Sequence, residues 1–343
     1  MLDERKRQVL QAIIDDYIST AEPIGSRTIA RKYGLGVSPA TIRNEMSDLE
    51  ALGFLEQPHA SAGRIPSAKG YRFYVDCLMG PQQVSDSDTV LINQWFDQKV
   101  RRIDEAFQET VRVLSRVTQN VSLLLAPQAA ACKFKYLQFL PFDETRVVVV
   151  IVTETGVMEN RLMKIPEGTS TEELQRIAGA MNHWLSGLAL PEIQTSLLEQ
   201  IKDEVLPRPE LLESAMALIR EATSGASSGE KVYLGGTTQL LNQPEFRDVS
   251  KVRQLLSMLE EEQLLYDILH TQDGSGVIVT IGQENKCQGI QDCSVIQASF
   301  RLDGQTVGTL AVLGPTRMEY ARTMAAIEFM QKHMEQILKK YQR

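Results

Sequence analysis

Apolar residues recur with helical spacing in three successive segments at the start of the chain. In residues 3–21 they lie every three or four positions with charged residues between them, and the pattern ends before Pro23. A second short helix is predicted from Pro23 to about Tyr33, where glycines follow. The third helix begins at Ser38, a residue type that caps helix N-termini. Its buried stripe is predicted to comprise Ile42, Met46, Leu49 and Leu52.

The segment after the third helix has the pattern of a small hairpin followed by a helix. The sequence FLEQPHASAGRIPSAKGYRF predicts a short strand, a polar turn containing Gly63, a return strand through Arg64 and Ile65, and a helix start near Ser67. Three helices followed by a hairpin form a winged helix-turn-helix. We therefore assign residues 1–79 to such a domain.

The remaining chain alternates between helix and strand patterns. The polar stretch after Gly80 predicts a linker over residues 80–94, and a long amphipathic helix is expected from about 95 to 121. Three β-rich segments then predict an antiparallel meander, and helical periodicity follows from about Ser170 to Ala222. Strand patterns return after residue 229. The fold class is therefore multi-domain α+β: a mixed domain with a central antiparallel sheet (95–165 and 229–343), interrupted by a mostly helical insertion (166–228).

Charge is distributed unevenly along the chain. The whole protein has a formal charge of −8, but residues 1–75 carry ten Lys or Arg and nine Asp or Glu. A nearly neutral N-terminal segment followed by an acidic remainder is typical of a DNA-binding protein that uses local positive charge and not a basic tail.

Several functional classes lack support in the sequence. No segment has the length and apolarity of a membrane span or a signal peptide, so we expect a cytoplasmic protein. The four cysteines and four histidines are scattered without zinc-ligand spacing, so we expect buried thiols and no metal. Neither Gly235-Gly236 nor DGSG at 273–276 matches a nucleotide-binding fingerprint, and the order of residues gives no catalytic grouping. We expect neither enzyme activity nor a cofactor.

The N-terminal half of the third helix carries the candidate residues for reading DNA. In a helix-turn-helix this part of the second helix of the motif enters the major groove. Arg43 can pair with guanine and Asn44 with adenine, or either can bind phosphate instead. Ser38 serves as a cap, as a phosphate contact, or as both. The predicted major-groove set is Ser38, Thr41, Arg43 and Asn44.

A second set of cations is expected at the DNA backbone and the minor groove. Each of these residues is alternatively a solvated surface cation, while Arg64 on a thin glycine-flanked loop fits a narrow minor groove best. His59 is expected to be structural or solvated, and the aromatic residues of KGYRFY to belong to the core in preference to stacking on bases. The wing and backbone set is Arg27, Arg31, Lys32, Arg64, Lys69 and Arg72.

The stretch SPATIRNEMSDLEALGFLEQPHASAGRIPSAKGYRFYVD closely resembles the signature of the HrcA family of heat-inducible transcription repressors. AEPIGSRTIA at 21–30, IGQEN at 281–285 and VGTLAVLGPTRMEYAR at 307–322 extend the resemblance, which is weakest across 166–228. It implies that the mixed domain is GAF-like and that the insertion mediates dimerisation. It also implies binding to the inverted repeat upstream of chaperone operons known as CIRCE, with the chaperonin keeping the repressor competent to bind.

Two features of the body have alternative interpretations. IGQEN is either a turn that closes the sheet or part of a ligand site, and Trp184 belongs either to a dimer interface or to the core of the insertion. Three hypotheses follow: a dimeric repressor of stress genes, a winged-helix regulator whose GAF-like domain binds a metabolite, and an enzyme or chaperone accessory that uses its winged helix for protein contact. Binding to an inverted repeat favours a homodimer, because one recognition helix covers only a few base pairs.

Overall fold

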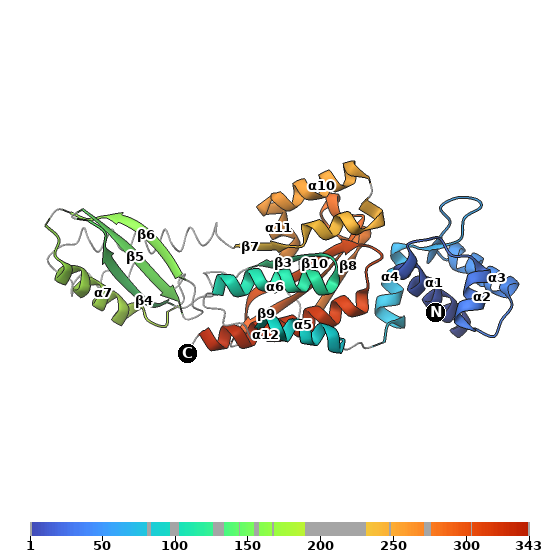
Figure 1. The fold of residues 1–343 in the computed structure, drawn as a ribbon, viewed down its shortest axis with the longest axis horizontal. Helices are drawn as coiled ribbons and strands as arrows, with labels where there is room; N and C mark the ends of the chain where they lie inside the picture. The colour runs from blue at the N-terminus through green and yellow to red at the C-terminus, as the bar shows by residue number, and fades with distance from the viewer. Residues whose placement is uncertain are drawn as a thin grey trace.

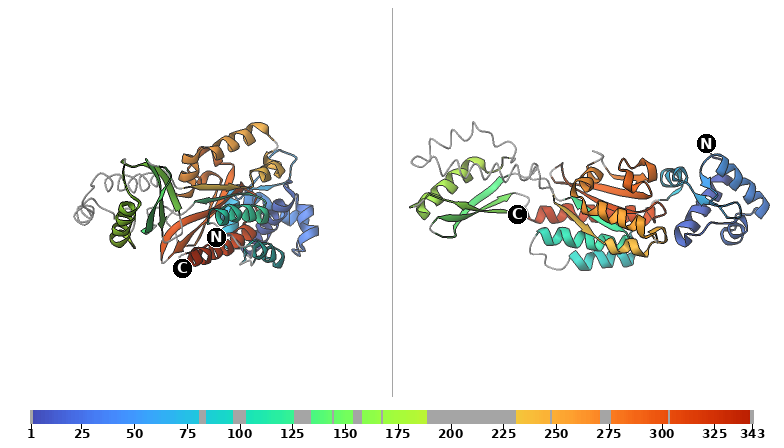
Figure 2. Two further views of the ribbon diagram at one scale, coloured as in Figure 1. Left: turned by 60° about the vertical axis from the view of Figure 1, so that its left-hand side comes forward. Right: turned by 90° about the horizontal axis from the view of Figure 1, so that it is seen from above.

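The computed structural model describes residues 2–80, 84–96, 103–125, 134–143, 145–153, 158–166, 168–188, 231–246, 248–270, 276–302 and 304–341. Three units follow one another along the long axis of the molecule (Figure 1). The N-terminal unit lies at one end, a large sheet with helices on both faces occupies the middle, and a smaller sheet with one helix lies at the other end. The view from above in Figure 2 shows the same order.

The N-terminal unit is a winged helix, as the sequence predicts. Helices α1 and α3 begin at the caps Asp3 and Ser38, whose side chains accept hydrogen bonds from backbone N–H groups of the first turn. The hairpin strands β1 and β2 pair in antiparallel register. The elements are α1 (Glu4–Thr20), α2 (Ser26–Tyr33), α3 (Pro39–Ala51), β1 (Leu55–Glu56), β2 (Ile65–Pro66), α4 (Ala68–Phe73) and the π-helical turn η1 (Tyr74–Leu78).

The middle unit is a five-stranded antiparallel sheet with the strand order β7-β3-β10-β9-β8. Alternate residues of its strands face opposite helical layers, because successive side chains of a strand point to opposite faces. Ile296 of β9 packs in the core shared with α6 and α12, whereas its neighbour Val295 packs toward α10 and α11. The strands are β3 (Val121–Leu125), β7 (Val232–Gly235), β8 (Val277–Ile281), β9 (Cys293–Leu302) and β10 (Gln305–Pro315); the helices are α5 (Asp86–Phe96), α6 (Ile103–Thr118), α10 (Val249–Glu260), α11 (Glu262–Leu269) and α12 (Tyr320–Tyr341), with short 3₁₀ turns η4 (Thr237–Asn242), η5 (Pro244–Phe246), η6 (Gly282–Glu284) and η7 (Gln288–Ile290).

The segment expected to be a linker is largely a docked helix. Ser85 accepts a hydrogen bond from the backbone N–H of Asp88 at the start of α5, and the Asp88 carboxylate is buried against Arg322 of α12. The polar residues of this segment therefore cap a helix and form an ion pair with α12 of the middle unit. Of the long helix expected from 95 to 121, the structure describes α6 as far as Thr118, after which strand β3 begins at Val121. Residues 97–102 of that prediction lie outside the described residues.

The meander expected in the central sheet forms a separate sheet. Strands β4 (Phe134–Pro141), β5 (Arg146–Thr153) and β6 (Met158–Lys164) pair only with one another among the described strands, and α7 (Thr171–Leu185) covers one face. The inserted unit therefore begins near residue 134 and not at 166, and its described part is a sheet with one helix. The helical prediction for 189–222 lies outside the described residues. Periodicity identified these strands, but it does not specify which sheet a strand joins.

Candidate nucleic-acid interface

The start of helix α3 is built from two hydroxyl groups. The Ser38 hydroxyl accepts a hydrogen bond from the backbone N–H of Thr41 at 3.1 Å, and the two hydroxyl oxygens lie 3.0 Å apart. Pro39 occupies the first turn, where its missing N–H costs nothing. Ile42, Met46 and Leu49 face the core, which orients the opposite side of the helix outward. Ser38 therefore caps the helix, and its side chain lies where a helix N-terminus favours an anion.

Arg43 and Asn44 lie on the outward side of α3. Both are exposed, and neither makes a hydrogen bond or ion pair within the described part of the chain. Ser47 is also exposed and lies one turn further along the same face. The sequence interpretation omitted Ser47, although its spacing of three and four residues from Asn44 and Arg43 would have identified it. These side chains are available to hydrogen-bond partners outside the protein.

The carboxylates of α3 are paired with cations from elsewhere in the domain. Lys6 of α1 lies 2.9 Å from Glu45 and 3.1 Å from Asp48, and Arg64 lies 2.8 Å from Glu50. Hydrogen bonds to Glu45 and Asp48 raise the pKa of Lys6. The helix therefore presents its arginine with its own acidic residues neutralised, which reduces repulsion of DNA phosphates. Lys6 was not among the predicted site residues, because periodicity does not reveal ion pairs between helices.

Arg64 lies at the base of the wing, not at its tip. Its backbone forms two hydrogen bonds with Ile24, at 2.9 and 3.0 Å, and its guanidinium donates to Glu50. Gly63 makes this approach possible, because a Cβ at that position would lie 2.4 Å from the backbone of Ile24. Arg64 thus fixes the wing against the segment before α2 and against α3, a role that the prediction of a minor-groove contact did not include.

The other predicted backbone contacts fall into two groups. Arg27 and Arg31 on α2 are exposed and make no hydrogen bond or ion pair with any residue that the structure describes. Lys32 instead pairs with the buried carboxylate of Asp16. Lys69 donates to the backbone oxygen of Leu52 at 2.8 Å, close to the C-terminus of α3, and so stabilises that end of the helix.

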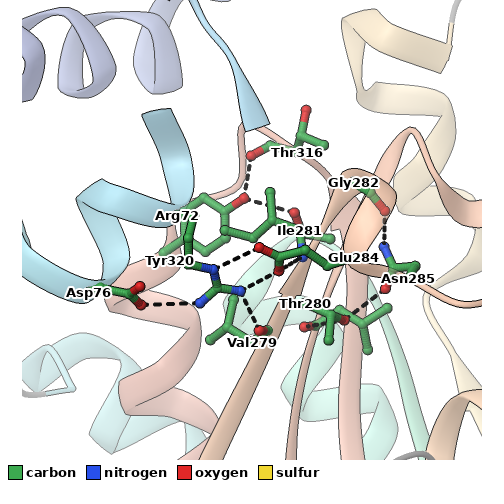
Figure 3. A network of polar contacts seen from close by, with 12 residues as sticks. Arg72, Asp76, Val279, Thr280, Ile281, Gly282, Glu284, Asn285, Thr316 and Tyr320 are labelled. Carbon is green, nitrogen blue, oxygen red and sulfur yellow. Dashed lines mark hydrogen bonds and ion pairs between the residues drawn. The ribbon is translucent and has the colours of Figure 1, made fainter. Parts of the chain in front are cut away.

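Arg72, expected at the DNA backbone, connects the winged helix to the middle unit instead (Figure 3). Its guanidinium donates to Glu284 at 2.8 Å, to the backbone oxygen of Val279 at 2.6 Å and to Asp76 at 3.2 Å. Burial acts to raise the pKa of Glu284, but hydrogen bonds from Arg72 and from the backbone N–H of Ile281 outweigh it and lower that pKa. With these donors engaged, we do not retain Arg72 among the proposed DNA contacts.

A second arginine joins the same two units from the opposite direction. Arg317 of the middle unit donates to the backbone oxygen of Ile18, in the last turn of α1, at 2.7 Å, and also to Glu245 and Gln243. At the same boundary, the rings of Tyr71 and Tyr320 lie 5.7 Å apart, and one hydrophobic core continues through both units. The winged helix is therefore docked on the middle unit. These arginines belong to sequence motifs already noted, but their partners across the boundary between the units are more than 200 residues away.

The described residues contain no group of three or more His, Cys, Asp or Glu residues placed to hold a metal ion, and none of their helices is long and apolar enough to cross a membrane. Burial raises the pKa of the Cys293 thiol to about 12, which makes it a poor nucleophile. Cys77 is exposed, contrary to the expectation of buried thiols, and Cys132 lies outside the described residues.

Known proteins agree with this arrangement of domains. Residues 1–75 match the family described as "Winged helix-turn-helix transcription repressor, HrcA DNA-binding", and residues 104–324 match "HrcA protein C terminal domain". The chain belongs to the HrcA family. It is 44% identical over 338 residues to the heat-inducible transcription repressor HrcA of Desulfitobacterium hafniense, covering 98% of each chain. It is 45% identical over 341 residues to the HrcA of Pelotomaculum thermopropionicum, covering 99% of this chain and 97% of that one.

A solved structure supports the fold independently of close sequence similarity. The crystal structure of a hypothetical protein at 2.2 Å resolution is 22% identical, covers 99% of this chain and 100% of its own, and superposes with a TM-score of 0.68. HrcA proteins are DNA-binding transcription repressors and not enzymes. The recognition of the family from the sequence motifs is confirmed, as are the winged helix and the mixed α+β class.

Proposed function

We propose that this HrcA-family protein represses chaperone operons by binding the CIRCE inverted repeat as a homodimer. The observation that carries this proposal is the outward face of α3, where Arg43 and Asn44 have no partner in the described chain while the helix's carboxylates are neutralised. Two such faces related by a two-fold axis match an inverted repeat. Repression needs no catalysis and no cofactor in this scheme, since an occupied operator excludes the transcription machinery. We place the protein in the cytoplasm, where operator DNA lies.

Dimerisation is supported by the surface of the inserted unit. The face of the β4–β6 sheet that points away from α7 exposes large apolar side chains, which soluble monomers rarely gather on one face. Trp184 on α7 is half-buried and packs against the core of this unit, so it supports the unit's own fold at least in part. The exposed residues on or beside this sheet are Tyr136, Leu140, Phe142 and Leu162.

The chaperonin is proposed as the modulator through its effect on folding. A winged helix held by two arginines and a shared core must assemble correctly on the middle unit before its recognition helix can act. A chaperonin that assists this assembly would raise the active fraction of repressor. When unfolded proteins occupy the chaperonin, less of it would be free to assist the repressor, and the active fraction of repressor would fall.

The direct test is fluorescence anisotropy with a labelled CIRCE duplex and a scrambled duplex over a salt series. Tight binding that depends on the repeat and weakens with salt is expected, because phosphate contacts release counterions. Equal weak binding to both duplexes, unchanged by added chaperonin, would contradict the proposal. Mass photometry of the same complex should give two protein chains per duplex.

Arg31→Ala should show whether Arg31 contacts the DNA phosphates, which fix the position of the protein, or the bases, which carry the sequence. Arg31 is exposed on α2 with no partner in the described residues, so we assign it to a phosphate. Losing one phosphate contact per subunit should weaken binding to both duplexes by a similar factor and reduce the salt slope by about 1.8 for a dimer. Lys69→Ala should act in the same direction, whereas an unchanged slope for either variant would remove that residue from the backbone set.

A further inference from the structure

A cavity of about 510 Å³ lies between α11 and the β8–β9 edge of the central sheet. Its walls are apolar where Leu264 and Ile268 of α11 face Val295 of β9 and Ile290 of the loop that precedes β9. This volume lies within the range of about 300–1,000 Å³ that is typical of small-molecule sites. Helix α11, which lines the cavity, lies on the far side of the sheet from α12 and away from α3 (Figure 1).

One buried polar group inside this cavity has no partner. Gln297 of β9 is only 5% exposed, and its Oε1 atom accepts no hydrogen bond from any described residue. It lines the cavity on the same strand face as Val295 and Cys293, which are apolar. Burying an amide oxygen without a donor is unfavourable, because the oxygen loses its hydrogen bonds to water and gains none in return. The Gln297 Oε1 atom is therefore suited to accept a hydrogen bond from a donor group of a bound ligand.

The charges around the cavity balance. Lys286 and Asp267 line it with opposite charge, and the Glu284 carboxylate is already neutralised by Arg72. A ligand with a net charge would gain no compensating field from such a lining. The lining therefore favours an uncharged molecule.

We propose that this cavity binds an uncharged ring compound with a carboxamide, lactam or nucleobase edge, and that its occupancy is transmitted to the winged helix through Glu284 and Arg72. A glutamine amide offers one acceptor and two donors in a plane, so an edge with an adjacent donor and acceptor complements it with two hydrogen bonds. The apolar walls accommodate the ring. Such a ligand would make the affinity of the repressor for DNA depend on the concentration of a small molecule.

The loop beside the cavity provides the connection to the DNA-binding unit (Figure 3). Asn285, which lines the cavity, donates to the backbone oxygens of Gly282 at 2.9 Å and Cys293 at 2.8 Å and accepts from Thr280 at 2.7 Å. The residue before it, Glu284, also lines the cavity and holds Arg72 of the winged helix. A ligand that contacts Asn285, or Thr280 which donates to it, therefore acts on the residue next to Glu284 of the ion pair between the units.

The first test measures binding to the full-length protein without DNA. Benzamide and adenine at millimolar concentration should raise the melting temperature, and calorimetry should give one site per chain. N,N-Dimethylbenzamide, which lacks the donor, should bind at least about tenfold more weakly, as should the anion benzoate. If neither benzamide nor adenine raises the melting temperature, or if the dimethyl compound binds equally well, the site assignment is overturned.

Variants locate the site and test the transmission. Gln297→Met keeps the size of the side chain and should abolish the stabilisation by benzamide. Gln283→Met, an exposed position of the turn η6 that does not line the cavity, should leave it intact. Benzamide should change operator affinity in the wild type, and operator DNA should change benzamide affinity by the same factor. Arg72→Gln should remove this coupling while benzamide still binds. Coupling of wild-type size in Arg72→Gln would overturn the transmission route, and this result is independent of whether CIRCE or another operator is the target.

Discussion

Replacing Arg43 with alanine is expected to weaken binding to the inverted repeat by about 2–6 kcal/mol, because a dimer loses one bidentate base contact of about 1–3 kcal/mol in each half-site. Binding to a scrambled duplex should fall only a few-fold. The reason lies in the geometry of α3: Arg43 is exposed beside a helix N-terminus, without an internal partner in the described chain. Fluorescence anisotropy with both duplexes at one salt concentration measures the ratio directly.

Arg43→Lys is the matched control, since it keeps the positive charge and loses the planar pair of donors. It should retain affinity for the scrambled duplex and still lose most of the preference for the repeat. Asn44→Ala should also lose preference for the repeat over the scrambled duplex. Its loss should depend on other base pairs of the half-site than the loss for Arg43→Ala. A proportional loss on both duplexes for Arg43→Ala would instead show that this guanidinium binds phosphate.

Local patterns were sufficient to predict the elements of the winged helix. Ser38 with Pro39 identified the start of α3, and the turn containing Gly63 identified the hairpin, because capping and turn formation depend on residues adjacent in sequence. The exposure of Arg43 and Asn44 followed from the same periodicity that buries Ile42 and Met46. These features need no knowledge of the rest of the chain.

Contacts between distant segments were not accessible from local patterns. Arg72 has the spacing and charge of a phosphate contact, but its partner Glu284 lies 212 residues away. Lys32 and Arg64 are likewise engaged with carboxylates on other elements. The same limit explains the three strands after residue 134, whose alternation is equally compatible with joining the central sheet or forming another. A surface cation is thus a weaker prediction than a helix cap, because its partner is chosen by the tertiary fold.

The docking of the winged helix ties its orientation to the middle unit. Arg72 and Arg317 each reach across the boundary between the units, and a single core continues beneath them. In the proposed homodimer, a change in the middle unit would therefore alter the spacing of the two recognition helices. A ligand that binds one state of the middle unit better than another would then change operator binding.

Gly63→Ala is expected to give a large loss of stability in the winged helix. An added Cβ would lie 2.4 Å from the carbonyl carbon and oxygen of Ile24 and 2.6 Å from its nitrogen, and backbone atoms cannot move aside as a flexible side chain does. The pairing between Ile24 and Arg64 must then separate, which also removes Arg64 from Glu50. We expect the free energy of unfolding to fall by about 3 kcal/mol, the upper end of the usual range for overpacking. Urea unfolding of the wild type and the variant measures this difference.

Gly80→Ala provides the matched control, because no described residue lies within 4 Å of the added Cβ and the backbone there is not left-handed. Its stability should stay within about 0.5 kcal/mol of the wild type, as for a typical surface substitution. Operator binding should fall in Gly63→Ala at a temperature where the protein is still folded, because the wing is no longer fixed to α3 through Arg64. If Gly63→Ala and Gly80→Ala unfolded at the same urea concentration, the close approach of the wing to Ile24 would not contribute to the stability of the domain, and the role assigned to Arg64 at the base of the wing would fail with it.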